Sequence, residues 1–303
     1  MAKKLNNTAL LFILLALGGA YLLITNFGGG SAETNIPTQL VSLDSAKVTD
    51  IVISPKQGNG SVITLSRTSG KWTVSQAGKT VKADQNGPSA MLAALTNVKP
   101  KSLAAVSKAK WEKYEVTDSL GTRVKAMNGS KVLTDIVMGK FSFQQQPQSM
   151  TSFVRLTGKD QVFSVDGPVA MGFNRPFDQF RDRSFLKINK ANVTKISYEA
   201  GGVSKTVSKQ GNTWIGSDST SVDTYLNGLA NLSGTGFKDG FQGGTPIGKV
   251  TVEGNNMPAT VVSCYQDGNG FVLQSSQNPD TWFSSDSTAT YQSVFGGLGG
   301  LFR

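Results

Sequence analysis

The side chains able to do acid–base or nucleophilic chemistry are few in this 303-residue chain, which holds no histidine and one cysteine, Cys264. The missing histidine excludes Ser-His-Asp and Cys-His nucleophile systems and His-ligated zinc or haem. A single cysteine excludes intrachain disulfides and multi-cysteine metal cages. Cys264 lies in a strand-like run at residues 259–265, where we expect a buried and inert thiol rather than a reactive one. We therefore predict no cofactor and no metal site.

Two carboxylates remain as a possible acid–base pair. Asp178 and Asp182 are four residues apart and would share one face of a helix. Three arginines surround them, at Arg175, Arg181 and Arg183. We expect ion pairing rather than glycosidase-like use of the two carboxylates, so no catalytic residue is predicted.

The segment at residues 174–189 is rich in arginine and phenylalanine, and we interpret it as a strut between two domains. Its aromatic residues recur every three to five positions with charges between them, which predicts a short amphipathic helix starting near Pro176. Two interpretations stay open: a strut held by Arg–Asp pairs, or a docking surface, since arginine and phenylalanine are enriched in interface cores. The residues predicted to bind a partner are Arg175, Phe177, Phe180, Arg181, Arg183 and Phe185.

Residues 9–25 carry no charge and predict a membrane-spanning helix of about 26 Å, close to the hydrocarbon thickness of a bilayer. A cleaved signal peptide is the alternative, because Lys3 and Lys4 precede the apolar run. We favour an uncleaved anchor, since the run is long for a signal peptide and no clear small-residue cleavage motif follows. The side chains predicted to meet the bilayer are Leu10, Leu11, Phe12, Ile13, Leu14, Leu15, Leu17, Tyr21, Leu22, Leu23 and Ile24.

The flanking charges predict the orientation of this anchor. Lys3 and Lys4 lie before it, and the first basic residue after it is Lys47. The positive-inside rule then predicts a single-pass protein of the inner (cytoplasmic) membrane, with a cytoplasmic amino terminus and a periplasmic or extracellular main domain. Residues 1–27 form the stub and anchor, and residues 28–43 a flexible tether. The formal charge of +10 would suit nucleic acid, but that location argues for a solvated surface beside anionic lipid instead.

Beyond the tether, the chain repeats a pattern of strands and one helix. Alternating apolar and polar residues at 47–53 and 192–198 predict matching first strands, and Trp72 and Trp214 lie in matching later strands. A helix is predicted after each tryptophan, one over residues 85–97 capped by Asp84 and one ending near Leu232 capped by Ser221 or Asp223. The predicted fold is α+β: two tandem repeats of an antiparallel sheet plus helix, at residues 44–173 and 190–297, with a tail at 298–303.

The same residues carry a family resemblance. The order of V-T-x-I, Gly70-Lys71-Trp72, Met138-Gly139-Lys140, Phe153-Val154-Arg155 and the run at 180–186 resembles a bacterial domain-of-unknown-function family. Its members are membrane-anchored extracytoplasmic proteins, often encoded beside gliding-motility-type ABC transporters. The resemblance implies an extracytoplasmic location at the membrane and partners that are integral membrane proteins, of which ABC transporter subunits are the first candidates. It implies no catalytic residue.

We therefore predict a non-enzymatic, membrane-anchored accessory or scaffold subunit of a membrane protein complex, associated with an ABC transporter of the gliding type. One alternative is a module that binds cell-wall or exported polysaccharide, with Trp111 and Tyr114 stacking on sugars; the same residues also suit a packed corner of the sheet. A further alternative is a subunit of another large membrane assembly, respiratory or photosynthetic. The run at 144–148 is expected to be a hairpin loop open to contact with a ligand or partner.

Overall fold

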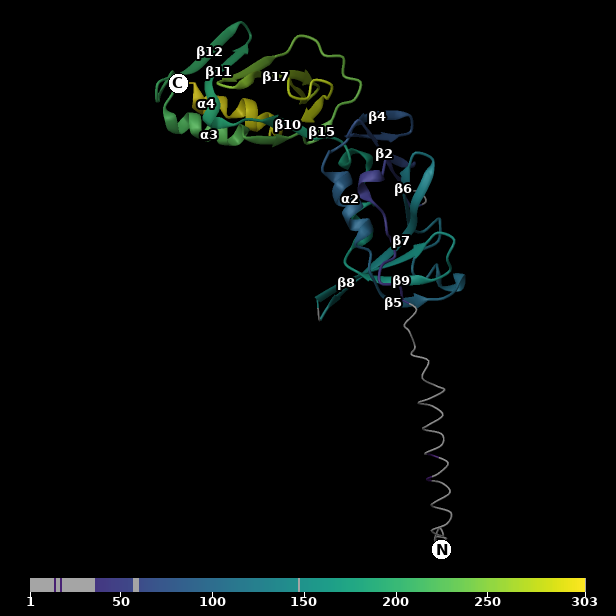
Figure 1. Cartoon of the computed structure of the whole chain (residues 1–303). Coiled ribbons are helices and arrows are strands. Elements are labelled where there is room, and N and C mark those ends of the chain that lie inside the picture. The colour runs from purple at the N-terminus through teal and green to yellow at the C-terminus, as the bar shows by residue number, and fades with distance from the viewer. Residues whose placement is uncertain (1–13, 15–16, 18–35, 57–59, 147, 303) are drawn as a thin grey trace. The chain divides into compact units, whose positions relative to one another are not determined.

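The computed structural model describes residues 14, 17, 36–56, 60–146 and 148–302 (Figure 1). Among these residues no helix is both long enough and apolar enough to cross a bilayer. The predicted anchor at 9–25 lies outside the described residues apart from Leu14 and Leu17, which are helical and exposed. The chain divides into two compact units: Met1–Thr80 with Asn86–Arg175, and Val81–Gln85 with Pro176–Arg303.

In the described part of the chain, the first unit is built on a nine-stranded sheet in the order β4-β3-β2-β1-β6-β7-β8-β9-β5. Starting at β3 and ending at β5 on the far edge, each strand in this order pairs antiparallel with the next one. The strands are β1 (Asp50–Ser54), β2 (Ile63–Thr68), β3 (Lys71–Gln76), β4 (Lys79–Lys82), β5 (Pro100–Ala105), β6 (Thr122–Asn128), β7 (Lys131–Gln145), β8 (Gln148–Leu156) and β9 (Val162–Asp166). The helices are α2 (Gly87–Thr96) and the 3-10 turns η1 (Ser45–Lys47), η2 (Lys108–Lys110) and η3 (Val169–Gly172).

Helix α2 buries the apolar face that the sequence predicted, with Met91, Leu92 and Leu95 inside. Its predicted cap is wrong, because the helix begins after Asn86. Asp84 belongs to the second unit, where it donates its backbone N–H to the carbonyl of Phe180 at 2.9 Å.

The second unit contains, among its described residues, an eight-stranded sheet in the order β13-β12-β11-β16-β17-β18-β19-β15 and a two-stranded sheet, β10-β14. Its strands are β10 (Ser184–Lys187), β11 (Val193–Ala200), β12 (Val203–Gln210), β13 (Thr213–Ile215), β14 (Asn231–Ser233), β15 (Gly236–Phe237), β16 (Gly248–Gly254), β17 (Met257–Asp267), β18 (Gly270–Ser275) and β19 (Phe283–Ser285). Its helices are α3 (Ser219–Leu229), α4 (Leu298–Leu301), the 3-10 turns η4 (Phe177–Gln179) and η5 (Lys190–Asn192), and the π-helix η6 (Gln292–Gly296).

The apolar face predicted for helix α3 is confirmed, because the side chains of Tyr225, Leu226 and Leu229 are buried. Its cap is Asp218, whose carboxylate accepts a 2.8 Å hydrogen bond from the backbone N–H of Ser221. The predicted caps, Ser221 and Asp223, therefore lie inside the helix. Asp218 was missed because Ser, Thr and Asp follow one another here, and each of these types is a good cap.

Two segments differ from the sequence prediction. Residues 174–189 contain the turn η4 and the strand β10 in place of an amphipathic helix. The end of the chain, predicted to be a tail, contains α4, and Leu298 and Leu301 are buried in the core of the second unit. The apolar residues of both segments therefore find partners inside that unit, which stabilises conformations that local periodicity does not predict.

The described end of the predicted tether, residues 36–43, also packs on the first unit. Leu40 donates its backbone N–H to the carbonyl of Val98, 3.1 Å away, and Val41 is buried. The free tether is therefore shorter than predicted on the side of the folded domain.

The two large sheets share much of their order of connections. Along the chain, three antiparallel strands (β1–β3 or β11–β13) precede an α-helix (α2 or α3), and in the first unit β4 is added at the sheet edge before the helix. The later strands β6–β9 and β16–β19 then add in sequence beside the first strand of their own sheet. At the far edge of the first sheet, β5 follows α2 and pairs with β9. At the far edge of the second sheet, β15 pairs with β19, but β14 lies between α3 and β15 in the chain and pairs with β10 instead.

Candidate functional site

The side chains that the sequence suggested for chemistry are the thiol of Cys264 and the carboxylates of Asp178 and Asp182. In the structure the thiol is buried and both carboxylates accept hydrogen bonds. Cys264 is buried on β17, and burial raises the pKa of its thiol to about 12, so the thiolate does not form near neutral pH. Asp178 accepts a 3.1 Å hydrogen bond from Arg181, and Asp182 accepts one from the backbone N–H of Ser184 at 2.9 Å. Within the residues described, no cluster of three or more His, Cys, Asp or Glu side chains is arranged to hold a metal ion.

Arg181 is the centre of a cluster inside the second unit. Its guanidinium is 5% exposed and donates two hydrogen bonds to Asp239, at 2.8 and 2.9 Å. The ring of Phe237 lies 3.5 Å from its Cζ, so the guanidinium is held by both a planar bidentate pair and an aromatic face. The expected ion pairing of this segment is therefore present, with Asp239 as the partner that sequence did not identify.

The other residues predicted to bind a partner are placed as follows. Phe180 and Phe185 are buried, and Phe185 meets Phe283 edge-on at 5.5 Å between ring centroids. Phe177 is half-buried. Arg183 donates to the carbonyl of Gly234, and Arg175, in the first unit, donates to that of Gly172. Phe180, Arg181 and Phe185 thus face inward, and partner binding by this segment stays a prediction.

An exposed apolar surface lies instead on the hairpin of β7 and β8. Phe141, Phe143 and Met150 are 46%, 49% and 42% exposed. Phe143 and Met150 are direct partners across the hairpin, and Phe141 is two residues from Phe143, so all three side chains share one face. Figure 1 shows this hairpin extending away from the body of the first unit. We call it the hairpin arm, residues 139–152.

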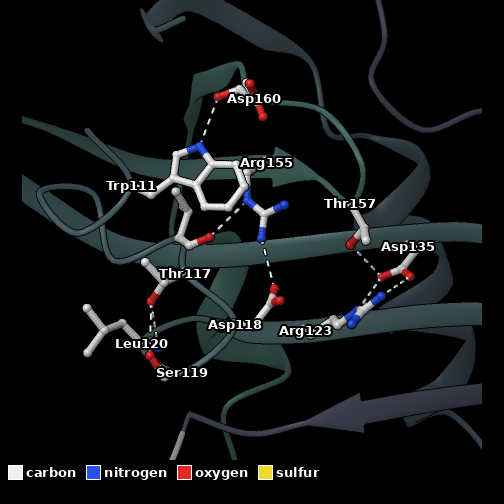
Figure 2. Close-up of polar contacts among 11 residues, drawn as sticks. Trp111, Thr117, Asp118, Ser119, Leu120, Arg123, Asp135, Arg155, Thr157 and Asp160 are labelled. Carbon is white, nitrogen blue, oxygen red and sulfur yellow. Dashed lines mark hydrogen bonds and ion pairs between the residues drawn. The ribbon is translucent and has the colours of Figure 1, made fainter. Parts of the chain in front are cut away.

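The loop after η2 is fastened to the same sheet by Arg155 of β8 (Figure 2). The buried Arg155 guanidinium stacks on the Trp111 ring, 3.8 Å from its centroid, and donates to the carbonyl of Val116 and to Asp118, each at 2.9 Å. Trp111 also donates its indole N–H to the carbonyl of Asp160 at 2.9 Å. These contacts explain the Arg in the Phe-Val-Arg motif: it fixes a loop.

A second ion pair beside this loop connects β6 to β7 (Figure 2). Arg123 donates to both oxygens of Asp135, at 2.8 and 2.7 Å, and Thr157 donates to the same carboxylate at 2.8 Å. Burial opposes ionisation of Asp135, yet these hydrogen bonds hold its pKa below the usual value. The same pair raises the pKa of Arg123. The carboxylate is therefore a structural anion.

The family described as "Domain of unknown function (DUF4340)" matches residues 74–245, more than half of the chain. The chain belongs to the DUF4340 family. No curated protein and no solved structure matches it. The matched DUF4340 region includes the hairpin arm, the Arg155 contacts and the Arg181 cluster, and ends before β16.

Sequence reasoning missed the apolar face of this DUF4340 chain. The run Phe141-Ser142-Phe143 alternates as a strand should, and the Gln-rich run at 144–148 was expected to be a hairpin loop. Nothing in that pattern tells whether the phenylalanines face a core or solvent. The signal that was available is the lack of charge from Phe141 to Val154, beside a predicted turn.

Proposed function

We propose that this DUF4340 chain is a non-enzymatic, single-pass membrane-anchored accessory subunit, which docks on an integral membrane protein through its hairpin arm. The exposed face of Phe141, Phe143 and Met150 is the observation that carries this proposal. Aromatic and methionine side chains are enriched in protein interfaces, and they dominate the binding energy when a partner covers them.

The composition of the hairpin arm favours a protein over a lipid surface. No charged residue lies between Phe141 and Val154. Segments that bind membrane surfaces usually combine apolar side chains with lysine or arginine. Glutamine and serine side chains flank the apolar face here, and they can form hydrogen bonds at the rim of a protein interface.

The backbone of the arm offers a second means of attachment. Strand β6 begins at Thr122, which pairs with Met138 of β7, so β7 continues past the end of its neighbour. From Phe141 to Gln145 the registered partner of β7, in the part of the chain described, is β8 alone. A partner strand can add to such an edge through main-chain hydrogen bonds.

The class of partner follows from the predicted anchor and the family resemblance. An anchor at residues 9–25 would hold the folded units at the outer face of the inner membrane, where integral membrane proteins present their extracytoplasmic loops. The resemblance makes the permease of a gliding-type ABC transporter the first candidate, and a subunit of another membrane assembly the second. The buried Cys264 and the ion-paired Asp178 support a role without catalysis.

We also propose that the two units arose by duplication of one α+β repeat. The shared order of connections in their sheets supports this origin, as does the matching order of sequence patterns. Experimental structures of the two units should superpose with β1 on β11 and β6 on β16. A best superposition that matches other strands would contradict duplication.

The docking proposal can be tested by photo-crosslinking in living cells. A photoreactive phenylalanine at position 143 of the full chain should form an adduct with a membrane permease. The same group at Val106, which is 68% exposed but lies outside the arm, is the matched control. Equal adducts from both positions, or no adduct from position 143, would overturn docking through the arm.

A further inference from the structure

The first unit contains a basic pocket of about 800 Å³ on the opposite face of the hairpin arm from the exposed phenylalanines. It is formed by β5, β7, β8, β9 and the loop after η2. Lys101, Lys113 and Lys140 contribute to its wall, and none of the described residues that line it is acidic. A volume of this size is typical of small-ligand sites, and the three lysines predict a ligand with negative charge.

The ammonium groups converge on one aromatic ring. The Nζ atoms of Lys113 and Lys140 lie 5.3 and 6.0 Å from the centroid of the Tyr114 ring. Lys101 is at the rim, where it forms a 3.0 Å ion pair with Asp166. Among the described residues, Lys113 and Lys140 enter no ion pair, so their charges are available to a bound anion.

The floor of the pocket is aromatic and rigid. The Tyr114 and Phe153 rings lie with their centroids 4.5 Å apart and their planes tilted by 38°, and the Tyr114 hydroxyl donates to the carbonyl of Ala104 at 3.1 Å. Arg155 holds the loop that carries Tyr114 through its contacts with Val116 and Trp111. Figure 2 shows Arg155 beside the Trp111 ring. An aromatic face that is fixed before binding can take the C–H face of a sugar ring at little entropic cost.

Hydroxyl groups complete the lining. Phe153 of β8, Ser164 of β9 and Ser102 of β5 are successive partners across the sheet, and the two serine hydroxyls lie 2.6 Å apart. Ser142 and Thr151 form a cross-strand pair on the same face of the arm. Each hydroxyl can donate and accept, which suits the hydroxyl groups of a carbohydrate.

A glycine and a bulge create the space for this pocket. Between the pairs Met138–Val154 and Phe141–Ser152, β7 has one more residue than β8, so the strand bulges at Gly139. A Cβ on Gly139 would collide with the carbonyl oxygen of Tyr114. Glycine therefore lets the loop approach β7, where Lys140 donates its backbone N–H to the same carbonyl at 3.1 Å.

We propose that this pocket binds an acidic sugar. The carboxylate, sulfate or phosphate group lies against Lys113 and Lys140, the apolar face of the ring lies on Tyr114 and Phe153, and the serine and threonine hydroxyls bind the sugar hydroxyls. This site is additional to protein docking, because the two use opposite faces of the arm. The arm can therefore hold a glycan and a protein partner together.

The test uses the full chain purified in detergent, with calorimetric titration of four probes. The probes are tetragalacturonate, a sulfated heparin tetrasaccharide, neutral maltotetraose and inorganic phosphate. We expect at least one acidic tetrasaccharide to bind, with affinity that falls as salt rises, and we expect neither maltotetraose nor phosphate alone to match it. The double variant Lys113→Gln/Lys140→Gln should bind at least about tenfold more weakly, since it loses two charge-assisted contacts.

Two controls keep the result specific. Lys131→Gln removes an exposed lysine of β7 outside the pocket and should leave affinity unchanged. Phe143→Ser, on the opposite face, should also leave it unchanged, so loss of docking and loss of sugar binding remain distinguishable. Equal affinity for maltotetraose, equal affinity for phosphate alone, or full binding by the double lysine variant would overturn the proposal. So would binding to vesicles of anionic lipid with no binding to either acidic sugar, which would assign the pocket to lipid headgroups.

Discussion

Arg155 lies with its guanidinium 3.8 Å from the centroid of the Trp111 ring, and the same group donates to the carbonyl of Val116. A single buried arginine on β8 thus fixes both ends of the loop at residues 111–116. That loop carries Lys113 and Tyr114, which form one wall of the basic pocket. The rigidity of the pocket therefore depends on a residue that does not line it.

Replacing Arg155 with methionine should destabilise the first unit. Arg155→Met keeps the side-chain length but loses the stack on Trp111 and the hydrogen bond to Val116, which we expect to cost about 2 kcal/mol. Chemical denaturation measures this change. Lys159→Met, at an exposed position in the turn after β8, is the control and should change stability little. A loss for Arg155→Met no larger than for that control would show that the contacts are not structural.

A second prediction concerns Gly139, which the backbone of Tyr114 approaches closely. Gly139→Ala places a methyl group against the Tyr114 carbonyl, so the loop must move. We expect a loss of about 2 kcal/mol, the usual range for overpacking, together with weaker binding of acidic sugars. Gly172→Ala is the matched control, because a Cβ there meets no atom within 4 Å. Unchanged stability and sugar binding in Gly139→Ala would contradict the role given to this glycine.

Cys264 should be unreactive in the folded chain. Its pKa is raised to about 12 by burial, so the thiol stays protonated, and a disulfide reagent at pH 8 should react only after denaturant is added. An added exposed thiol, Ser287→Cys, should react at once. Because the folded pKa lies above the unfolded value of about 8.5, this group makes stability fall as pH rises between about 9 and 12. Rapid native labelling of Cys264 would show that it is accessible.

Asp135 has the opposite dependence on pH. Its folded pKa is lowered, since the hydrogen bonds from Arg123 and Thr157 outweigh the effect of burial, so its stabilisation is present above the unfolded pKa and is lost as pH falls. Asp135→Asn should be about 2 kcal/mol less stable at pH 7, and this difference should shrink below pH of about 4. Denaturation of both proteins across pH 3 to 7 measures this. A constant difference across that range would mean that the ionised carboxylate contributes nothing.

The strands were the most predictable part of the fold. Period-two alternation around Ile51, Ile53 and Ile196 directly reflects burial of one sheet face, and these side chains are buried. The apolar faces of both helices were also correct, because residues three and four apart must share a side of a helix. Their caps were less predictable: Asp84, Ser221 and Asp223 all have the right chemistry, but a neighbouring residue occupies the cap position in each helix.

The site was far less predictable, because it depends on contacts between residues distant in the sequence. Arg181 was expected to pair with a nearby aspartate, and it does donate to Asp178, but its bidentate partner is Asp239, 58 residues away. Trp111 and Tyr114 were noted as candidates for stacking on sugars, and Tyr114 does line the pocket, whereas Trp111 is covered by Arg155. Lys113 and Lys140 were not identified, since only the loop contact at Gly139 brings them together.

The most direct test of the docking proposal is affinity purification of the full chain from membranes in mild detergent, with partners identified by mass spectrometry. We predict that the wild-type chain is recovered with an ABC ATPase and its permease. The variant Phe141→Ser/Phe143→Ser/Met150→Ser should fold normally, because its changed side chains are exposed, and should be recovered without them. Recovery of the wild-type chain alone, or of the triple variant with the same partners, would contradict docking through the hairpin arm.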